Sequence, residues 1–322
     1  MDAIGIGSLN LDMIFEIEGS ELVELDIEPG AEKYGTSEEF SVLLDILRSR
    51  GRLVGQAGGG SAANVIFALG KMGFKTGILG MVGKDEYGDF ILESMGKVDV
   101  KRVGRENRTG MCISIIIDND RSLLVLPNAN DLFTTAPCDL EYLRNSKVVH
   151  LTSFVGKRSM MAQIRIARDL QSEVIVSLDP GEIYARRGIE VMKPLIERAD
   201  IMFPSETEVR ILTGMDPMRG SKKLMRMGPD IVVCTMGRKG AAIVTAEGTI
   251  RIPSEKVKPV DKTGAGDVFA ASFIAGMLRK WDLEECGRFA AMTSTRSITE
   301  YGRDGYPDLE LLKSFEGGRT DA

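Results

Sequence analysis

The sequence is poor in the residues on which several kinds of site depend. It has one histidine and four cysteines in 322 residues, and no two cysteines form a CxxC pair. The single histidine argues against a histidine-based catalytic triad, and the wide cysteine spacing argues against a zinc site or a disulfide framework. His150 lies in the strand-like run 148–151, so we expect it to be structural. Cysteines that are few and widely spaced fit a reducing cytoplasm.

The sequence also lacks an excess of positive charge and any long apolar run. Its net charge is −6, which argues against a surface for general binding to nucleic acids or anionic membranes. No stretch approaches the roughly 18 apolar residues of a membrane span, and Asp2 directly follows the initiator methionine. We therefore expect a cytoplasmic globular protein, without a signal peptide, whose partner is a small molecule.

Two nucleotide-binding fingerprints are absent. The run Gly5-x-Gly7-x-x-Asn10 lacks the third glycine of a dinucleotide-binding turn, which disfavours an NAD-dependent dehydrogenase. A Walker A loop is excluded because Gly83-Lys84-Asp85 has Ile78, not glycine, at the required upstream position.

Short apolar segments alternate with amphipathic ones over most of the chain. This alternation predicts an α/β fold with a mostly parallel central sheet covered on both faces. We expect strands at 76–82, 147–151, 174–178, 201–203 and 231–235, and helices at 159–170, 189–198, 206–213 and 218–227. Ligands of such sheets bind beyond the carboxyl ends of the strands. The polar residues expected there include Asp179, Ser205, Glu208, Thr235 and the stretch 261–267.

The long segment before the second glycine cluster reads as an inserted lid. Thr36 to Glu39 form a capping box ahead of a helix with Phe40, Leu43, Leu44 and Leu47 on one face. Strand-like runs flank it at 13–17 and 53–57, and a hairpin is predicted from 111–117 and 122–126. We predict one domain, 1–322, with a lid at about 13–57 plus 109–127. Only residues 316–322 are expected to be frayed.

The stretch Gly264-Ala265-Gly266-Asp267 predicts a tight glycine turn that opens a helix. Free N–H groups in a first helical turn and the positive end of the helix dipole favour an anion. A carboxylate at Asp267 would suit a reaction that deprotonates a hydroxyl beside a phosphate. Taken alone, the same stretch is more often an ordinary helix start whose Asp complements the dipole.

Two further stretches are ambiguous in the same way. The run from Gly58 to Asn64 lets a ligand approach the backbone closely, and Asn64 can donate to or accept from a hydroxyl. It also suits a tight turn between strand and helix. Asn10 and Asp12 project from one face of an extended segment, as they would on a surface strand.

Several spaced motifs together resemble the ribokinase-type (PfkB) carbohydrate kinase family. The two family signatures correspond to residues 59–64 continued by 81–88, and to residues 261–267. Shorter family-like stretches occur in order at 7–12, 108–110, 179–181, 204–208, 235–240 and 298–302. The resemblance covers nearly the whole chain. It implies a ribokinase-like three-layer α/β/α fold with a small β-rich lid, and transfer of the γ-phosphoryl group of ATP, with Mg²⁺, to a hydroxyl of a small molecule.

The resemblance also implies roles for individual residues. Asp267 would be the base, and Gly264, Ala265 and Gly266 would form the anion hole. The residues that would hold the acceptor are Asn10, Asp12, Gly59 and Asn64. The nucleotide site would include Thr235, Gly237, Gly240, Lys262 and Ser205. Glu208 would bind Mg²⁺ indirectly, and Asp261, with backbone near Gly302, would bind a monovalent cation such as K⁺ where the family uses one.

The sequence departs from the family pattern at three positions. Ser205 replaces the usual Asn and leaves Glu208 without its normal partner, Lys262 replaces a Thr, and Ser61 stands where ribokinases have Lys. A solvated Lys262 and a Lys262 that reaches the triphosphate both remain open.

The acceptor is not decided by the motifs. A sugar or sugar acid is one reading. The long insertion with Leu22 to Gly30 is more similar to adenosine kinases, whose nucleoside acceptor needs an apolar roof that Phe15, Phe40 or Phe154 could provide unless they are plain core. A catalytically weak, ligand-sensing member is the third reading. Lid strands of this family often pair between subunits, which favours a homodimer.

Overall fold

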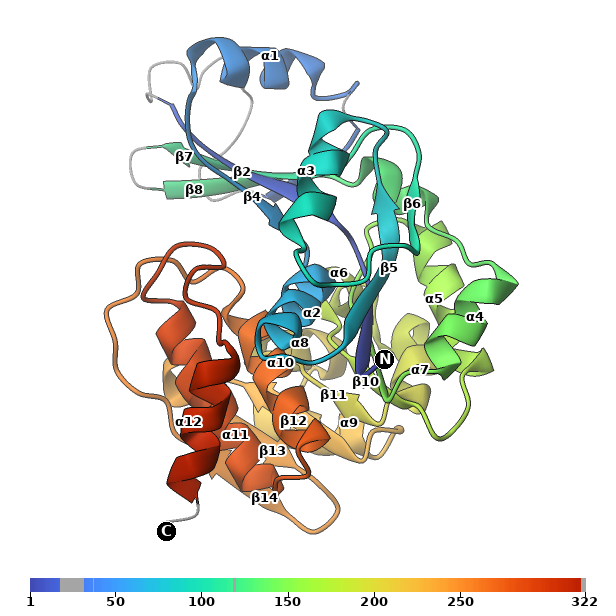
Figure 1. Ribbon diagram of the computed structural model, residues 1–322, viewed down its shortest axis with the longest axis vertical. Helices are drawn as coiled ribbons and strands as arrows, with labels where there is room; N and C mark the ends of the chain where they lie inside the picture. The colour runs from blue at the N-terminus through green and yellow to red at the C-terminus, as the bar shows by residue number, and fades with distance from the viewer. Residues whose placement is uncertain (18–31, 37, 118–119, 320–322) are drawn as a thin grey trace.

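The computed structural model describes residues 1–17, 32–36, 38–117 and 120–319, and these residues form two β-sheets flanked by helices (Figure 1). The central sheet has nine strands in the order β14-β13-β12-β11-β10-β9-β1-β5-β6. The strands from β12 to β6 are all parallel, and β13 and β14 are antiparallel. The predicted α/β fold is therefore confirmed. The strand bounds are β1 Ala3–Ile6, β5 Thr76–Val82, β6 Val103–Arg105, β9 Val148–Leu151, β10 Ile175–Leu178, β11 Ile201–Met202, β12 Ile231–Thr235, β13 Ala241–Val244 and β14 Thr249–Ile252.

Both faces of the central sheet are buried. Alternate strand residues enter different cores: Ala3 packs with one helical layer and Ile4 with the other, as the two-residue period of a strand requires. The first layer holds α2 Ser61–Lys71, α10 Ala265–Leu278, α11 Leu283–Ser297 and α12 Leu309–Arg319. The second holds α4 Pro137–Arg144, α5 Lys157–Asp169, α6 Gly181–Ala185, α7 Ile189–Arg198, α8 Glu206–Thr213 and α9 Pro217–Met225.

The second sheet, here called the small sheet, lies with α1 (Ser41–Arg50) and α3 (Glu86–Ser94) beyond the central sheet (Figure 1). Its strand order is β3-β8-β7-β2-β4, with bounds Glu32–Tyr34, Asp120–Leu126, Gly110–Ile117, Asn10–Glu16 and Arg52–Gly59. The capping box before α1 is present: the Thr36 N–H donates to Glu39 Oε2 at 2.7 Å, and the Glu39 N–H donates to Thr36 Oγ1 at 3.2 Å. The segment 22–30 lies outside the described residues, and the lid boundaries stay a prediction.

Three features differ from or add to the expected elements. Residues 316–319 are not frayed, because α12 extends to Arg319 and anchors itself through Leu312, which is fully buried. The antiparallel strands β13 and β14 and the helices α4, α11 and α12 were not anticipated.

His150 is fully buried on β9, where its Nδ1 lies 2.9 Å from Ser177 Oγ. Burial lowers the pKa of His150 to about 3, so the ring is neutral and part of the core, as expected.

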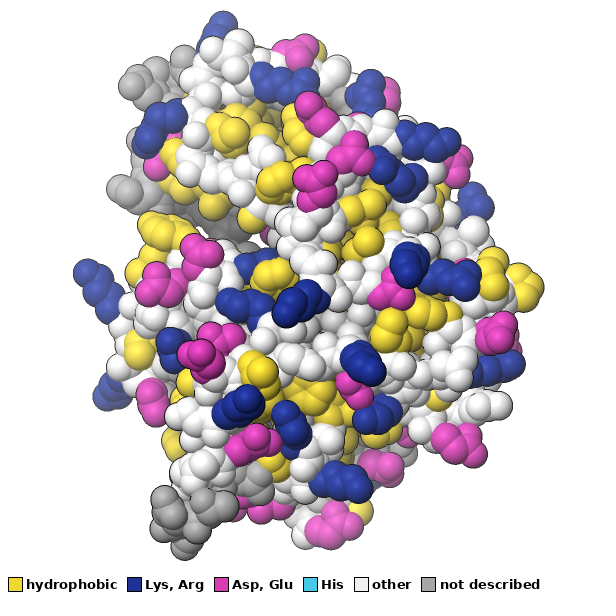
Figure 2. All heavy atoms as spheres, in the orientation of Figure 1, with side chains coloured by type: hydrophobic (Ala, Val, Ile, Leu, Met, Phe, Trp, Pro, Cys, Tyr) yellow, Lys and Arg dark blue, Asp and Glu magenta, His cyan; other side chains and the backbone are white. Residues whose placement is uncertain are grey.

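The surface mixes both signs of charge. Figure 2 shows Lys and Arg side chains interspersed with Asp and Glu over the face drawn. Among the helices of the described residues, none is long and apolar enough to cross a membrane.

Candidate active site

The predicted glycine turn opens α10. Gly264 is the residue before the helix and has φ of 76°, a left-handed conformation that favours glycine. A Cβ at this position would overlap the Tyr306 hydroxyl, whereas a Cβ at Gly266 would meet nothing within 4 Å. In the described structure, no side chain caps this helix start. The first turn of α10 thus has the properties of an anion site.

Asp267 lies in that first turn and is held from α2. Ser61 Oγ donates to Asp267 Oδ1 at 2.6 Å, and Asn64 Nδ2 donates to Asp267 Oδ2 at 2.8 Å. Burial raises the pKa of Asp267 to about 6, while these two hydrogen bonds and the positive charge of Arg303 act to lower it. A carboxylate with such a pKa can exchange a proton near neutral pH.

The small sheet contributes the predicted acceptor residues. Asn10 and Gly59 are directly opposite each other on β2 and β4, and the Asp12 carboxylate lies against Gly59 so closely that a Cβ there would overlap it. Asn10 Oδ1 accepts a hydrogen bond of 2.9 Å from Asn130 Nδ2. The fourth predicted acceptor residue, Asn64, lies on α2 and donates to Asp267.

A pocket of about 140 Å³ lies on the other side of the glycine turn. It is lined by Thr235, Gly237 and Gly240 together with Ala265 and Gly266. The predicted nucleotide residues near β12 are therefore beside the predicted anion hole. Sequence reasoning missed the remaining lining residues, which are Ser254, Phe269, Ala291, Ser294 and Thr295. Most of them come from α11, a helix that was not anticipated.

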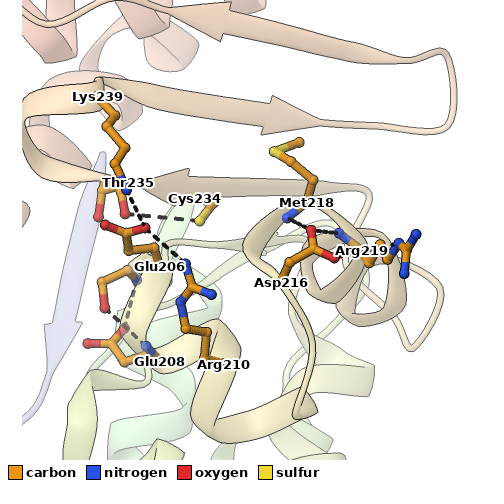
Figure 3. A network of polar contacts seen from close by, with 10 residues as sticks. Glu206, Glu208, Arg210, Asp216, Met218, Arg219, Cys234, Thr235 and Lys239 are labelled. Atoms are coloured by element: carbon orange, nitrogen blue, oxygen red, sulfur yellow. Dashed lines mark hydrogen bonds and ion pairs between the residues drawn. The ribbon is translucent and has the colours of Figure 1, made fainter.

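Ser205 and Glu208 form a capping box at the start of α8. The Ser205 N–H donates to Glu208 Oε2 at 2.9 Å, and Ser205 Oγ accepts from the Glu208 N–H at 3.2 Å (Figure 3). Glu208 therefore has a direct partner, although the usual Asn is missing. Ser205 also bridges to Thr235 on β12, which places the capping box beside the pocket that Thr235 lines.

The turn 237–239 is tied to the same helix by charges. Figure 3 shows Glu206 between Lys239 and Arg210; the N to O distances are 3.3 Å and 3.4 Å. These cations lower the pKa of Glu206, the hydrogen bond from Lys239 most of all. The pairs are on the surface, so their main effect is to orient the turn and not to stabilise the fold.

Two partly buried carboxyl groups, Glu208 and Asp179, lie near each other in this region. Burial raises the pKa of Glu208, and burial together with the charges of Glu208 and Asp267 raises that of Asp179 well above its usual range. Among the described residues, no group of three or more His, Cys, Asp or Glu could enclose a metal ion. Carboxylate oxygens in this arrangement fit Mg²⁺ held largely through water and phosphate, as that ion prefers.

Asp261 and Gly302 are brought together, as the family resemblance implies. Asp261 Oδ1 accepts from the Thr263 N–H at 2.9 Å, and its Oδ2 accepts from the Gly302 N–H at 3.3 Å. The side chain of Lys262 is exposed. Its reach toward a phosphate and the binding of a cation at Asp261 stay predictions.

Four residues around the site were not assigned roles from the sequence. Ser61, Arg303 and Tyr306 interact with Asp267, and Asn130 holds the Asn10 side chain. Ser61 was noted only as a departure from lysine, and the others come from loops whose positions the strand and helix periodicities do not fix. A signal was present for Arg303 alone, because it directly follows the family-like stretch that ends at Gly302.

The comparisons with known proteins agree with this geometry. The sequence profile of the pfkB family carbohydrate kinase matches residues 34–308. An uncharacterized sugar kinase of Archaeoglobus fulgidus is 32% identical over 247 residues, which cover 74% of this chain and 98% of that protein. Adenosine kinase from Sinorhizobium meliloti has a similar fold, with a TM-score of 0.84 at 22% identity over 100% of this chain and 99% of that one.

A second solved structure is Arabidopsis thaliana ribokinase complexed with ribose and ATP. It has a TM-score of 0.79 and 26% identity, and the match covers 98% of each chain. The profile match spans most of the chain. The chain therefore belongs to the PfkB carbohydrate kinase family of ATP-dependent sugar and nucleoside kinases, and it is a phosphotransferase with an alcohol group as acceptor.

Proposed function

We propose that this kinase transfers the γ-phosphoryl group of ATP to a hydroxyl of a sugar or sugar acid, with Asp267 as the base. One observation carries the proposal: Asp267 is fixed by Ser61 and Asn64 in the first turn of α10, directly behind the glycine turn. The acceptor hydroxyl gives its proton to Asp267 while its oxygen bonds to the γ-phosphorus and the bond to the ADP oxygen breaks.

Alignment and charge neutralisation carry most of the acceleration in such a reaction. The N–H groups of Gly264, Ala265 and Gly266 face the developing negative charge at the start of α10. When bound, Mg²⁺ neutralises phosphate charge, and Glu208 would hold its water shell. Asp261 with the backbone at Gly302 would hold a monovalent cation.

Acceptor and nucleotide approach from opposite sides of this turn. Asn10, Asp12, Gly59 and Asn64 bind acceptor hydroxyls on the side of the small sheet, which acts as a lid over 13–57 and 109–127 and excludes water when it closes. The nucleotide contacts Thr235, Gly237 and Gly240, with Ser205 and Lys262 near its phosphates.

A specific observation bears on the nucleoside alternative. Phe15 and Phe154 are 5% and 0% exposed, and Phe154 stacks on Phe133 with ring centroids 5.0 Å apart. These two rings belong to the core and are not available to cover a nucleobase. Phe40 is only partly buried, so of the three candidate rings it alone could serve that purpose.

The experiment is a measurement of ADP release with ATP and Mg²⁺ against sugars, sugar acids and nucleosides. We expect turnover with a sugar or sugar acid, and an Asp267→Asn variant that remains folded but loses about 10²-fold or more in kcat. Near-native turnover by Asp267→Asn would exclude the assigned base. Nucleosides as the preferred acceptors would select the alternative.

A panel that gives thermal shifts without any ADP release would contradict catalysis and favour a ligand sensor. Chelation of the metal by EDTA is the matched control, since it should abolish ADP release and leave the fold unchanged.

A further inference from the structure

Arg303 is a half-buried cation beside the proposed base that the acceptor, nucleotide and metal assignments do not use. It lies in the loop between α11 and α12, and its Nε donates to Asn64 Oδ1 at 3.1 Å. Its guanidinium carbon lies 4.6 Å from the ring centroid of Phe67, and Nη1 is 3.8 Å from the Met95 sulfur. The Nη2 atom is buried and makes no hydrogen bond to the described residues.

This arrangement fixes the orientation of the Asn64 side-chain amide. Arginine can only donate, so Arg303 must face the carbonyl oxygen of Asn64. The amide nitrogen then points to Asp267 Oδ2, to which it donates at 2.8 Å. A flipped amide would set its NH₂ group against the guanidinium and its oxygen against a carboxylate. Arg303, Asn64 and Asp267 therefore form a chain with one favourable direction.

Arg303 is a positively charged side chain with several acidic groups around it. Asp12 on β2, Asp267 on α10 and the Tyr306 hydroxyl interact electrostatically with it. The charge of Asp267 also acts on Asp179 at the end of β10. Asp179 interacts in turn with Glu208. The charge of Arg303 lowers the pKa of Asp267 against the larger effect of burial. Without Arg303, the carboxylates would face one another with less compensation.

The loop that carries Arg303 is attached to both sides of the site. Lys71 Nζ at the end of α2 donates to the Arg303 carbonyl oxygen at 3.4 Å, and the Gly302 N–H donates to Asp261. Tyr306 follows in the same loop and lies against Gly264. The position of the guanidinium is thus set by the two segments that contain Asn64 and Asp267.

We propose that Arg303 is a positioning residue for phosphoryl transfer: it holds Asn64 so that the Asn64 amide donates to Asp267 and keeps the base aligned and ionised. The proposal rests on the proposed function of Asp267. Arg303 acts through Asn64 and not by touching the acceptor, because its Nη2 atom is buried.

The test compares Arg303→Met and Arg303→Lys with Arg288→Met, a control at an exposed arginine of α11. For Arg303→Met we expect kcat to fall about 10- to 100-fold and the acid limb of the pH profile of kcat to move up by about one pH unit. KM should change less than kcat. Arg303→Lys should return the acid limb most of the way to its native pH, and Arg288→Met should have the kcat and pH profile of the native enzyme.

Three results would overturn the inference. A large rise in KM with an unmoved acid limb would show direct binding of an anionic acceptor. A lower Tm with native kcat and pH profile would show a purely structural role. In a double-mutant cycle, Asn64→Ala and Arg303→Met should not be additive in their effect on the limb, and strict additivity would also contradict the inference.

A measurement without turnover separates this inference from the proposed function. In protein labelled with ¹³C at aspartate, the carboxyl resonance of Asp267, assigned through Asp267→Asn, should titrate at higher pH in Arg303→Met than in the native protein. An unchanged midpoint refutes the role of Arg303 even if no acceptor is phosphorylated. If the native protein phosphorylates no acceptor but the Asp267 midpoint is still higher in Arg303→Met, only the proposed function is refuted.

Discussion

Asp267 is subject to opposing influences that a carboxylate on the surface would not meet. Burial favours its neutral form, and Ser61, Asn64 and Arg303 favour its charged form. Burial prevails, so the folded protein binds a proton at Asp267 more tightly than the unfolded chain does. A base of this kind reduces the stability of the fold at neutral pH.

The pH dependence of stability should reveal these opposing effects on Asp267. The pKa of Asp267 is about 6 in the folded protein against an ordinary value of 3.8, so its effect on stability is absent below about pH 4 and is fully unfavourable above about pH 6. Asp267→Asn should therefore raise the Tm, and the gain over the native protein should grow between pH 4 and 6 and then level off. Calorimetry across this range measures it. A gain that shrinks as pH rises would mean that the ionised form is the favoured one.

The glycine turn allows a matched pair of substitutions. Gly264→Ala places a side chain at positive φ and against Tyr306, and should destabilise the protein by about 1–3 kcal/mol. Gly266→Ala adds a methyl group in open space inside α10 and should stabilise it by about 0.5–1 kcal/mol.

Denaturant unfolding of both glycine variants gives the comparison. Both should lose activity, because each methyl group lies at the anion site. Equal stability of the two variants would contradict the strain assigned to Gly264.

At this scale the sequence predicted which residues meet but not how they are held. The positions of Asp267, Asn64 and Gly59 followed from motifs at the ends of strands and starts of helices. Ser61 was expected only to alter acceptor contact, yet its hydroxyl donates to Asp267. Arg303 could not be derived, because a loop position 239 residues away from Asn64 depends on packing that no periodicity records.

Among the elements, α8 shows how one pattern can serve two purposes. Ser205 and Glu208 were interpreted through the nucleotide and metal, but the same S-x-x-E spacing is a capping box, and the structure contains it. The interpretations are compatible because α8 begins beside Thr235 on β12. The capping role of Ser205 neither supports nor contradicts its predicted nucleotide role.

Substitution of Ser205 separates the two roles. Ser205→Ala removes the cap of α8 and should lower the free energy of unfolding by about 1 kcal/mol, whereas Ser205→Asn supplies an equally good cap and should change it little. Denaturant unfolding measures the first role, and KM for ATP measures the second. Native stability of Ser205→Ala would show that the capping bonds contribute nothing.

Elements with a strong period were predicted closely, and weakly patterned ones were not. The predicted strand 76–82 and the helices 189–198 and 206–213 coincide with β5, α7 and α8. The helix α12 was not predicted and its end was expected to be frayed. Gly317 and Gly318 lower its helix propensity, while burial of Leu312 and packing of Phe315 against Trp281 and Phe289 stabilise it. Tertiary packing there overrides local preference.

For the whole molecule, we propose that the small sheet closes over the acceptor. Saturation with an acceptor and a non-hydrolysable ATP analogue should decrease the radius of gyration in X-ray scattering, because closure brings the small sheet toward α10. The nucleotide analogue alone serves as the control and should have a smaller effect. An unchanged scattering profile with both ligands bound would rule out a lid.

Among the described strands, β4 lies at an edge of the small sheet and is suited to pairing in a homodimer. Leu53 and Val54 on the edge strand β4 are 47% and 39% exposed, and an apolar edge strand favours pairing with another chain. We predict a dimer by light scattering that Leu53→Glu converts to monomer. Met161→Glu, which changes an exposed methionine of α5 far from the small sheet, should leave the dimer intact. A native monomer would refute this prediction.

The connection between β1 of the central sheet and β2 of the small sheet has a consequence for the affinity for the acceptor. Asn130 pairs with both the N–H and the carbonyl oxygen of Leu9, at 2.9 Å and 3.1 Å, and also holds the Asn10 side chain. It thereby takes the place of a neighbouring strand at the point where β1 passes into β2. The conformational entropy of Asn10 is already lost when the chain folds, so an acceptor does not lose it again on binding. Discrimination among acceptors at this position then depends on the fit of their hydroxyls to an amide whose direction is set in advance.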